Sequence, residues 1–362
     1  MTENVTDIVS GMRHRRGNTK GEQIMKVYTI KDIAAMAGVS VTTVSRVLNH
    51  RPDVNIATRE KVEQIIRDCH FVGNTNARGL KQGNEVIGVV IRGRSNPFLS
   101  SLAEAILERA DNVPDSFVTE YIDERADEFR TALRMTLQNH VKGLIFVGSL
   151  IDERVEAIRS LDVPMVFTTV NAESASLPRA SSVAVDDRSM GRLVAEELLN
   201  SGHRRIAVFG SNPVAGDSLA MRFQGFCDAF ADRGLSYDQT LYRETRFSFE
   251  AGYDIARTFF TERPDATALF AMSDTVAVGA IRALKDLGKS VPEDVSVVGF
   301  DGVDIGRFTL PRLTTVEQPV EEIARRSVNL LLDMMEKGAA PRHILVEASF
   351  RRRESVAQCV RA

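Results

Sequence analysis

Six short runs of β-branched and other apolar residues recur after residue 85, and they constrain the fold more than any other feature of the chain. The runs are VIGVVI (86–91), GLIFVG (143–148), PMVFTT (164–169), RIAVFG (205–210), TALFAM (267–272) and VSVVGF (295–300). Continuous apolar runs spaced by helical stretches predict parallel strands that helices cover on both faces. The predicted fold class of this part is therefore α/β.

Polar, small and aromatic residues lie at the positions where such sheets bind ligands, beyond the carboxyl ends of the strands. The stretches concerned are RGRSNPF (92–98), VDD (185–187), SNPVAGDSLAMRFQGF (211–226), SD (273–274) and FDG (300–302). We expect them to converge on one site. An aspartate at the end of a strand also caps helices, and for Asp274 capping is the favoured role.

An all-α segment precedes the predicted sheets. Thr29 begins a helix that we expect to span residues 30–37, and Gly38 supplies a tight turn after it. Ser40 can cap a second helix, and small alanines at the crossing allow the close approach of a helix-turn-helix. A third helix, capped near Thr58, completes a small core. The sequence therefore predicts a DNA-binding module, although short helix pairs also occur in proteins that never bind DNA.

The outward face of the second helix carries side chains suited to the major groove. Arg46 can donate to a guanine edge, Thr42 can contact bases or phosphate, and Val41 can touch a thymine methyl group. Ser45 lies on the same face. Asn55 and Thr58, at the start of the third helix, are expected to contact phosphates, with helix capping as the alternative role.

Charge divides the chain into a basic head and an acidic body. Residues 1–83 hold 13 Lys and Arg against 8 Asp and Glu, whereas the remainder holds 33 against 41. This asymmetry favours a nucleic-acid-binding module attached to a body that binds something else, although a solvated charged surface also produces it.

Other function classes find little support in the sequence. Three distant cysteines and six scattered histidines form no metal or redox motif, so we expect no metal and no cofactor. We find no phosphate-binding glycine loop, HExxH or GxSxG, which argues against an enzyme. With no apolar run of 18 residues and no secretory signal, we expect a cytoplasmic protein that contacts no membrane. A transport-type solute-binding protein is a further alternative.

Several motifs resemble the lactose-repressor (LacI/GalR) family of bacterial transcription regulators. In the head and hinge they are TIKDIAAMAGVSVTTVSRVLN (29–49), TREKV (58–62) and NTNARGLKQG (74–83). In the body they are RFQGF (222–226), SVVGFDG (296–302) and PRLTTVEQP (311–319). The resemblance implies a two-lobed effector domain similar to periplasmic sugar-binding proteins. It also implies a homodimer that binds near-palindromic operator DNA under the control of a small-molecule effector, as a repressor of carbohydrate genes.

The resemblance divides the chain into five parts. We expect residues 1–25 to be a disordered basic arm. Residues 26–72 are expected to form the helix-turn-helix domain, and residues 73–84 the hinge. Residues 85–200 and 318–346 form the N-terminal lobe of the effector domain, and 201–317 and 347–362 form its C-terminal lobe.

The hinge residues owe their expected role to the resemblance. Leu80 matches a leucine that inserts into the minor groove, where an apolar wedge kinks the duplex; its alternative role is to dock the linker on the body. The full set expected to contact DNA is Thr29, Ser40, Val41, Thr42, Thr43, Ser45, Arg46, Asn55, Thr58, Asn74, Ala77, Arg78 and Leu80.

The resemblance also implies an effector site. Its expected residues are Asn96, Phe98, Asp186, Arg222, Phe247, Ser273 and Asp301. A guanidinium from Arg222 and a carboxylate from Asp301 can clamp hydroxyl groups, and Phe247 can stack on a ring or pack in the core.

The chemical class of the effector stays open. Arg92, Arg94 and Arg246 suggest an anionic sugar acid or sugar phosphate, although they suit a solvated rim equally well. A purine or nucleoside is the competing effector.

Overall fold

A computed structural model describes residues 30–48, 54–68, 86–93, 96–110, 115–211 and 218–360. The chain forms two compact units, residues 1–75 and 76–362. No helix among the described residues has the length and apolar character needed to cross a bilayer.

The first unit contains three helices, α1 (Ile30–Ala37), α2 (Val41–Leu48) and α3 (Ile56–Asp68). Its small core consists of Ile33, Ala34, Ala37, Val44, Val47 and Val62. Gly38 has a φ of 67° at the turn, where a side chain would be strained. The Oγ of Ser40 accepts the amide of Thr43 at 3.1 Å and so caps α2 as predicted. The predicted cap near Thr58 is wrong, because α3 already begins at Ile56.

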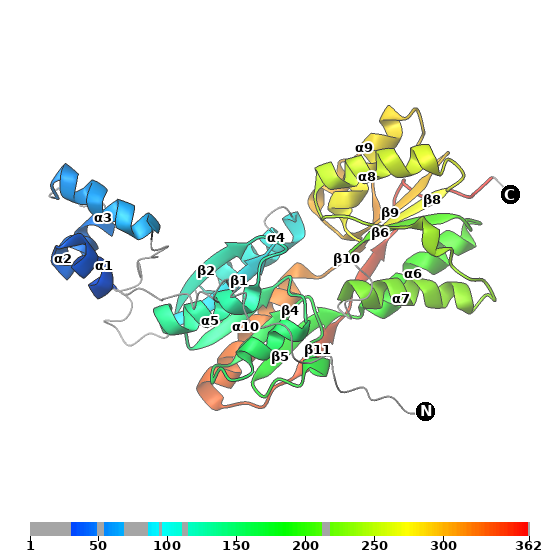
Figure 1. The fold of residues 1–362 in the computed structure, drawn as a ribbon. Helices are drawn as coiled ribbons and strands as arrows, with labels where there is room; N and C mark the ends of the chain where they lie inside the picture. The colour runs from blue at the N-terminus through cyan, green and yellow to red at the C-terminus, as the bar shows by residue number, and fades with distance from the viewer. Residues whose placement is uncertain are drawn as a thin grey trace, which may run out of the picture. The chain divides into compact units, whose positions relative to one another are not determined.

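Two six-stranded sheets form the second unit, each central to one lobe (Figure 1). In spatial order, the first sheet contains β11 (His343–Val346), β5 (Ala180–Val185), β4 (Met165–Thr168), β3 (Gly143–Val147), β1 (Val86–Arg92) and β2 (Ser116–Ile122). The second contains β12 (Ser349–Arg351), β10 (Thr314–Glu317), β9 (Ser296–Asp301), β8 (Ala268–Ala271), β6 (Ile206–Gly210) and β7 (Tyr242–Glu244). Every pairing is parallel except that of β10 with β12.

Helices cover both sheets on both faces, as the continuous apolar runs predict. The first sheet packs against α4 (Pro97–Ala110), α5 (Glu128–Asn139) and α10 (Val320–Lys337). In Figure 1, α8 (Phe249–Glu262) and α9 (Asp274–Asp286) lie on one side of the second sheet, and α6 (Asp187–Asn200) and α7 (Ser218–Ala231) lie on the other. Short 3-10 helices occupy Glu153–Ile158, Glu173–Ala175, Gln239–Leu241 and Asp304–Arg307. The α/β fold class is therefore confirmed.

Helix α6 belongs with the second lobe by its packing. It lies along α7, and the backbones approach so closely that a Cβ at Gly191 would overlap the carbonyl of Arg222. A Cβ at Gly225 would overlap the carbonyl of Arg188 in the same way. We therefore place the first crossing between the lobes directly after β5, whereas the sequence predicts that residues up to 200 belong to the N-terminal lobe.

Candidate functional site

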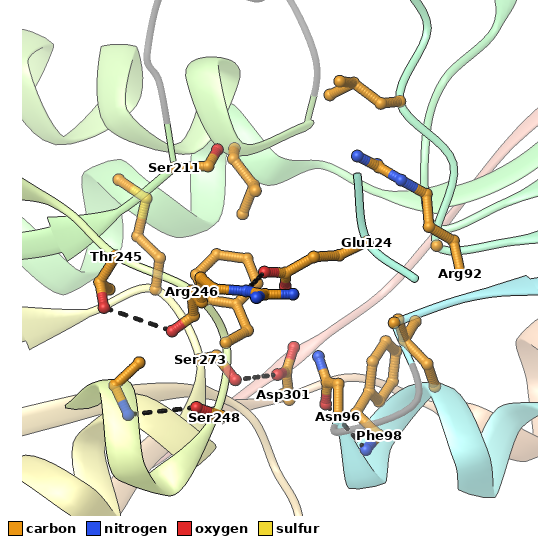
Figure 2. Close-up of a pocket in the computed structure, with 18 of the residues that line it drawn as sticks. Arg92, Asn96, Phe98, Glu124, Ser211, Thr245, Arg246, Ser248, Ser273 and Asp301 are labelled. Carbon is orange, nitrogen blue, oxygen red and sulfur yellow. Dashed lines mark hydrogen bonds and ion pairs between the residues drawn. The ribbon is translucent and has the colours of Figure 1, made fainter. Parts of the chain in front are cut away.

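A cavity of about 1140 Å³ lies between the carboxyl ends of the two sheets, where the fold predicts a ligand site (Figure 2). The first lobe contributes Arg92, Asn96 and Phe98 from the end of β1 and the start of α4. The second lobe contributes residues from four elements or the loops beside them, among them Arg222, Phe247, Ser273 and Asp301. Six of the seven predicted effector residues therefore line one cavity.

Asp187, Arg222 and Asp301 form what we call the floor cluster. Within it, Arg222 is held by Asp187 and by a backbone carbonyl. Its Nε and Nη2 both donate to Oδ1 of Asp187, at 3.1 and 2.7 Å, and Nη1 donates to the carbonyl of Met272 at 2.7 Å. The guanidinium also stacks on the ring of Phe300, 3.3 Å from its centroid. These contacts fix the side chain before any ligand binds, as preorganised binding requires.

Asp301 ends β9 with a buried carboxylate that is already hydrogen-bonded. It accepts the hydroxyl of Ser273 and the side-chain amide of Gln318, both at 2.9 Å. Burial raises the pKa of Asp301 to about 6, while the charge of Arg222 opposes the rise. Its φ of 116° is unusual for a residue with a side chain, and such strain gathers at binding sites.

Asn96, Phe98 and Phe247 complete the predicted lining. The Oδ1 of Asn96 accepts the amide of Phe98 at 3.0 Å at the start of α4, and both residues are buried. Phe247 lines the cavity and packs on the hydrophobic core as well, so both of its expected roles have structural support. One face of the cavity is thus aromatic and apolar, and polar groups converge on it.

Asp186 does not line the cavity. Its exposed carboxylate caps α6 by accepting the amide and the hydroxyl of Ser189, which sets it apart from the six expected effector residues that line the cavity. The buried residue is Asp187, the partner of Arg222. The signal that could have separated the two is position: the first residue of a helix points back toward the sheet, whereas the residue before it caps the helix.

Asp274 has a different role from the capping that was favoured for it. Ser273 caps α9, whereas the buried Asp274 accepts the amides of Gly302 and Val303, both at 2.8 Å, and the hydroxyl of Thr315. Burial and, second to it, the charge of Asp301 together raise the pKa of Asp274 to about 8. Asp274 therefore fixes the loop that follows Asp301, the last residue of β9.

Three charged side chains at the edge of the cavity, Arg246, Asp123 and Glu124, form what we call the rim triad. Arg246 donates from Nη2 to Oδ2 of Asp123 at 3.0 Å. Its Nε donates to Oε1 of Glu124, a contact that Figure 2 shows. The guanidinium is therefore already engaged by two carboxylates. This geometry removes Arg246 from the arginines that suggested an anionic effector, and Arg94 lies outside the described residues.

In the first unit, the predicted DNA-contacting face of α2 is open to solvent. Val41, Thr42 and Arg46 are exposed, whereas the hydroxyl of Thr43 lies 2.9 Å from that of Ser40. Asn55 accepts the amide of Arg59 through its carbonyl, which leaves its side chain beside the start of α3. Thr29, the side chain of Ser45 and the hinge residues Asn74, Ala77, Arg78 and Leu80 lie outside the described residues.

Comparisons with known proteins agree with this architecture. Residues 29–74 match the family model of bacterial regulatory proteins of the lacI family, and residues 195–356 match that of periplasmic binding protein-like domains. The transcriptional regulator MalR of Clostridium butyricum is 33% identical over 90% of this chain and 98% of its own.

Solved structures give the same picture. A complex of the transcriptional regulator CelR with cellobiose is 28% identical, with a TM-score of 0.67 over 91% of this chain and 99% of the other. The lac repressor dimer bound to operator and an anti-inducer is also 28% identical, with a TM-score of 0.69 over 92% and 100% of the two chains.

A helix-turn-helix unit joined to a two-lobed binding domain defines a ligand-responsive transcription regulator. The chain belongs to the lacI family of bacterial regulatory proteins. It is a DNA-binding transcriptional regulator and not an enzyme, which confirms the predicted family and class.

Proposed function

We propose that this regulator represses carbohydrate genes and that a sugar or sugar derivative in the interlobe cavity controls its binding to operator DNA. The observation that carries the proposal is the pairing of a preorganised Arg222 and Asp301 with the ring of Phe247 in one cavity. A guanidinium and a carboxylate bind hydroxyl groups, and an aromatic face stacks on a pyranose ring. The cellobiose complex of the related CelR supports the same ligand class.

The proposed control follows from the way the chain crosses between the lobes. Gln318 leaves β10 of the second lobe and precedes α10 of the first, and its backbone amide donates to the carbonyl of Asp301 at 3.1 Å. A ligand that contacts Asp301 therefore acts on a residue bonded to a crossover segment. Closure of the two lobes would change how the headpieces of a dimer meet DNA, and effector and operator would bias each other by the same factor.

A homodimer is part of the proposal because the second lobe exposes a group of apolar side chains. Ile305, Phe308 and Leu310 lie in or just after the 3-10 helix that follows β9, and the last two are 81% and 91% exposed. Large apolar side chains gathered on a surface mark interaction sites. We expect Phe308→Asp to yield monomers in sedimentation velocity and to weaken operator binding, while Arg282→Gln, on the exposed face of α9, leaves the dimer intact.

We further propose that α2 enters the major groove of a near-palindromic site and that Leu80 of the hinge wedges the minor groove. Such a protein would work in the cytoplasm, where the chromosome is. Arg46→Ala should relax specificity at one base position and cost about 1–3 kcal/mol of discrimination. Leu80→Ala should weaken binding to every site that has a deformable central step.

Two measurements test the proposal in sequence. The purified protein is first selected against a random pool of short duplexes, and an enriched near-palindrome is expected. Operator binding is then titrated with cellobiose, maltose, ribose and hypoxanthine, for the wild type and for Asp301→Asn. A response to a sugar that the variant loses supports the proposal. A response to hypoxanthine alone would replace the sugar with a purine, which could use the same ring and carboxylate.

A further inference from the structure

The charges of the rim triad bear on whether the effector is neutral or anionic. We propose that Arg246, Asp123 and Glu124 act as a charge filter that admits uncharged polyhydroxylated effectors and rejects their anionic derivatives. The inference rests on the proposed function, because it narrows the class of ligand that the same cavity takes.

The triad joins the two lobes at the cavity. Asp123 and Glu124 follow β2 in the first lobe, whereas Arg246 lies between β7 and α8 in the second. Within the described part of the chain, the ion pairs between the lobes are those of Arg246. All three side chains line the cavity, so an effector bound there lies near their charges.

The exposure of the triad indicates that its ion pairs contribute little to the stability of the fold. The side chains of Arg246 and Asp123 are 50% and 62% exposed, and water screens such a pair so well that it stabilises a fold very little. The side chain of Glu124 is less exposed, at 27%. Within the triad, two carboxylates nevertheless face one guanidinium, a negative surplus that the charge of the neighbouring Arg125 reduces. The backbone amide of Arg125 also donates to Asp123, so the carboxylate is fixed in this position.

The rest of the described lining extends this surplus. Its ionisable residues are four arginines, Arg92, Arg125, Arg222 and Arg246, and six acids, Asp123, Glu124, Glu244, Glu250, Asp254 and Asp301. Arg222 is already paired with the buried Asp187, so three arginines face six acids. Glu128 lies near Arg92, but burial raises its pKa to about 7, so near neutral pH this carboxyl adds only part of a negative charge.

This excess of acids selects against anions and suits hydroxyl groups. A carboxylate or phosphate on the ligand would enter a cavity of its own charge sign, and juxtaposed like charges are a strong device against wrong ligands. Carboxylate oxygens, in contrast, only accept hydrogen bonds, and each hydroxyl of a neutral sugar has one hydrogen to donate. The lining is therefore complementary to a polyol without a charge.

Binding of matched ligand pairs to the full-length protein tests the filter. The pairs are cellobiose with cellobionate and ribose with ribose 5-phosphate, titrated calorimetrically at constant ionic strength. The wild type should bind the neutral member of a pair at least about tenfold more tightly. The variant Asp123→Asn with Glu124→Gln keeps the shape of the rim but frees Arg246, and this preference should fall by about tenfold or more. Glu322→Gln, which breaks exposed pairs on α10 away from the cavity, should retain the preference.

Inorganic phosphate provides an arm that does not depend on the sugar. At matched ionic strength, phosphate should raise the Tm of the double variant more than chloride does, and it should have no such effect on the wild type. Adding Arg246→Gln to the double variant should abolish the effect.

Three results would overturn the filter: equal affinity of the wild type for both members of a pair, an unchanged preference in the double variant, or equal stabilisation of both proteins by phosphate. If neither sugar binds, cellobiose and ribose are excluded as effectors, while the phosphate arm still decides the filter.

Discussion

The floor cluster and the rim triad use the same chemistry in one cavity, an arginine with carboxylates, but they differ in burial. Arg222 and Asp187 are 5% and 6% exposed and share two hydrogen bonds, whereas Arg246 and Asp123 are at least half exposed and Glu124 is 27% exposed. Removing one member of a buried pair leaves an uncompensated charge in a medium of low dielectric. Removing one member of an exposed pair leaves a charge that water solvates.

The comparison separates two uses of charge in a binding site. At the floor, charge fixes geometry, because each polar atom is costly to leave without a partner. At the rim, charge acts on what approaches from solvent and contributes little to the fold. Mutations in the two clusters should therefore change different properties. Mutations in the floor cluster should change stability and effector affinity, and mutations in the rim triad should change selectivity among effectors.

The largest expected effect is that of Arg222→Met, which removes the cation and leaves Asp187 buried. We expect a loss of about 3–5 kcal/mol in the free energy of unfolding, measured in urea. Adding Asp187→Asn to this variant should restore most of the loss, because it removes the stranded charge. A loss below about 1 kcal/mol for Arg222→Met would show that the buried pair is not the constraint that its geometry indicates.

Asp301→Asn should reduce effector affinity by roughly 1.5–3 kcal/mol, the contribution of hydrogen bonds to a charged group. The affinity of the wild type should also fall as the pH drops through about 6, since protonation removes the charged acceptor, and the variant should lack this dependence. Titration calorimetry between pH 5 and pH 8 measures both effects. Parallel pH profiles for the two proteins would contradict the assignment of Asp301.

Asp274→Asn should flatten the dependence of stability on pH. The pKa of Asp274 is raised in the folded state, so its contribution to stability is complete below its unfolded pKa and is lost as the pH rises toward about 8. Asparagine imitates the protonated acid, accepting from Gly302 and Val303 and facing Thr315. Between pH 5 and pH 8 the wild type should lose about 3–4 kcal/mol more than the variant. Urea unfolding at both pH values tests this, and equal losses would be inconsistent with it.

The smallest expected effect on the fold is that of Arg246→Gln. The Tm should change by no more than about 2 °C, and the change should vanish at high salt because exposed charges are screened. Differential scanning fluorimetry measures it, with Arg282→Gln, from another exposed pair, as the matched control. A much larger fall in Tm would mean that the rim triad holds the lobes together. The rim triad would then stabilise the fold, as the floor cluster does.

Much of the fold could be predicted from the sequence, but only where a local pattern existed. All six apolar runs are strands, β1, β3, β4, β6, β8 and β9, because each lies in the interior of a sheet and is covered on both faces. Six strands were missed. Four of them, β2, β7, β11 and β12, are partly exposed edge strands, and β5 and β10 carry buried Ser and Thr in place of aliphatic residues. Their pairing depends on neighbours distant in sequence.

The candidate site divides in the same way. Arg222, Asp301 and Ser273 were found because strand ends and motifs mark them. Asp187, Gln318 and the rim triad were missed as a group, because their roles depend on partners from other elements, up to 123 residues away in the case of Arg246. No pattern within a few residues reports such a contact.

What the sequence determined by itself is the alternation of elements, the helix-turn-helix with its turn at Gly38 and its cap at Ser40, and the strand ends at which a ligand site forms. These depend on periodicity and on local hydrogen bonding, which act over a few residues. Only the tertiary structure decided which aspartate of VDD is buried and that Arg246 belongs to Asp123 and Glu124. It also showed that α6 packs with the second lobe. Burial and charge pairing are properties of the assembled chain, because they arise where distant segments exclude water together.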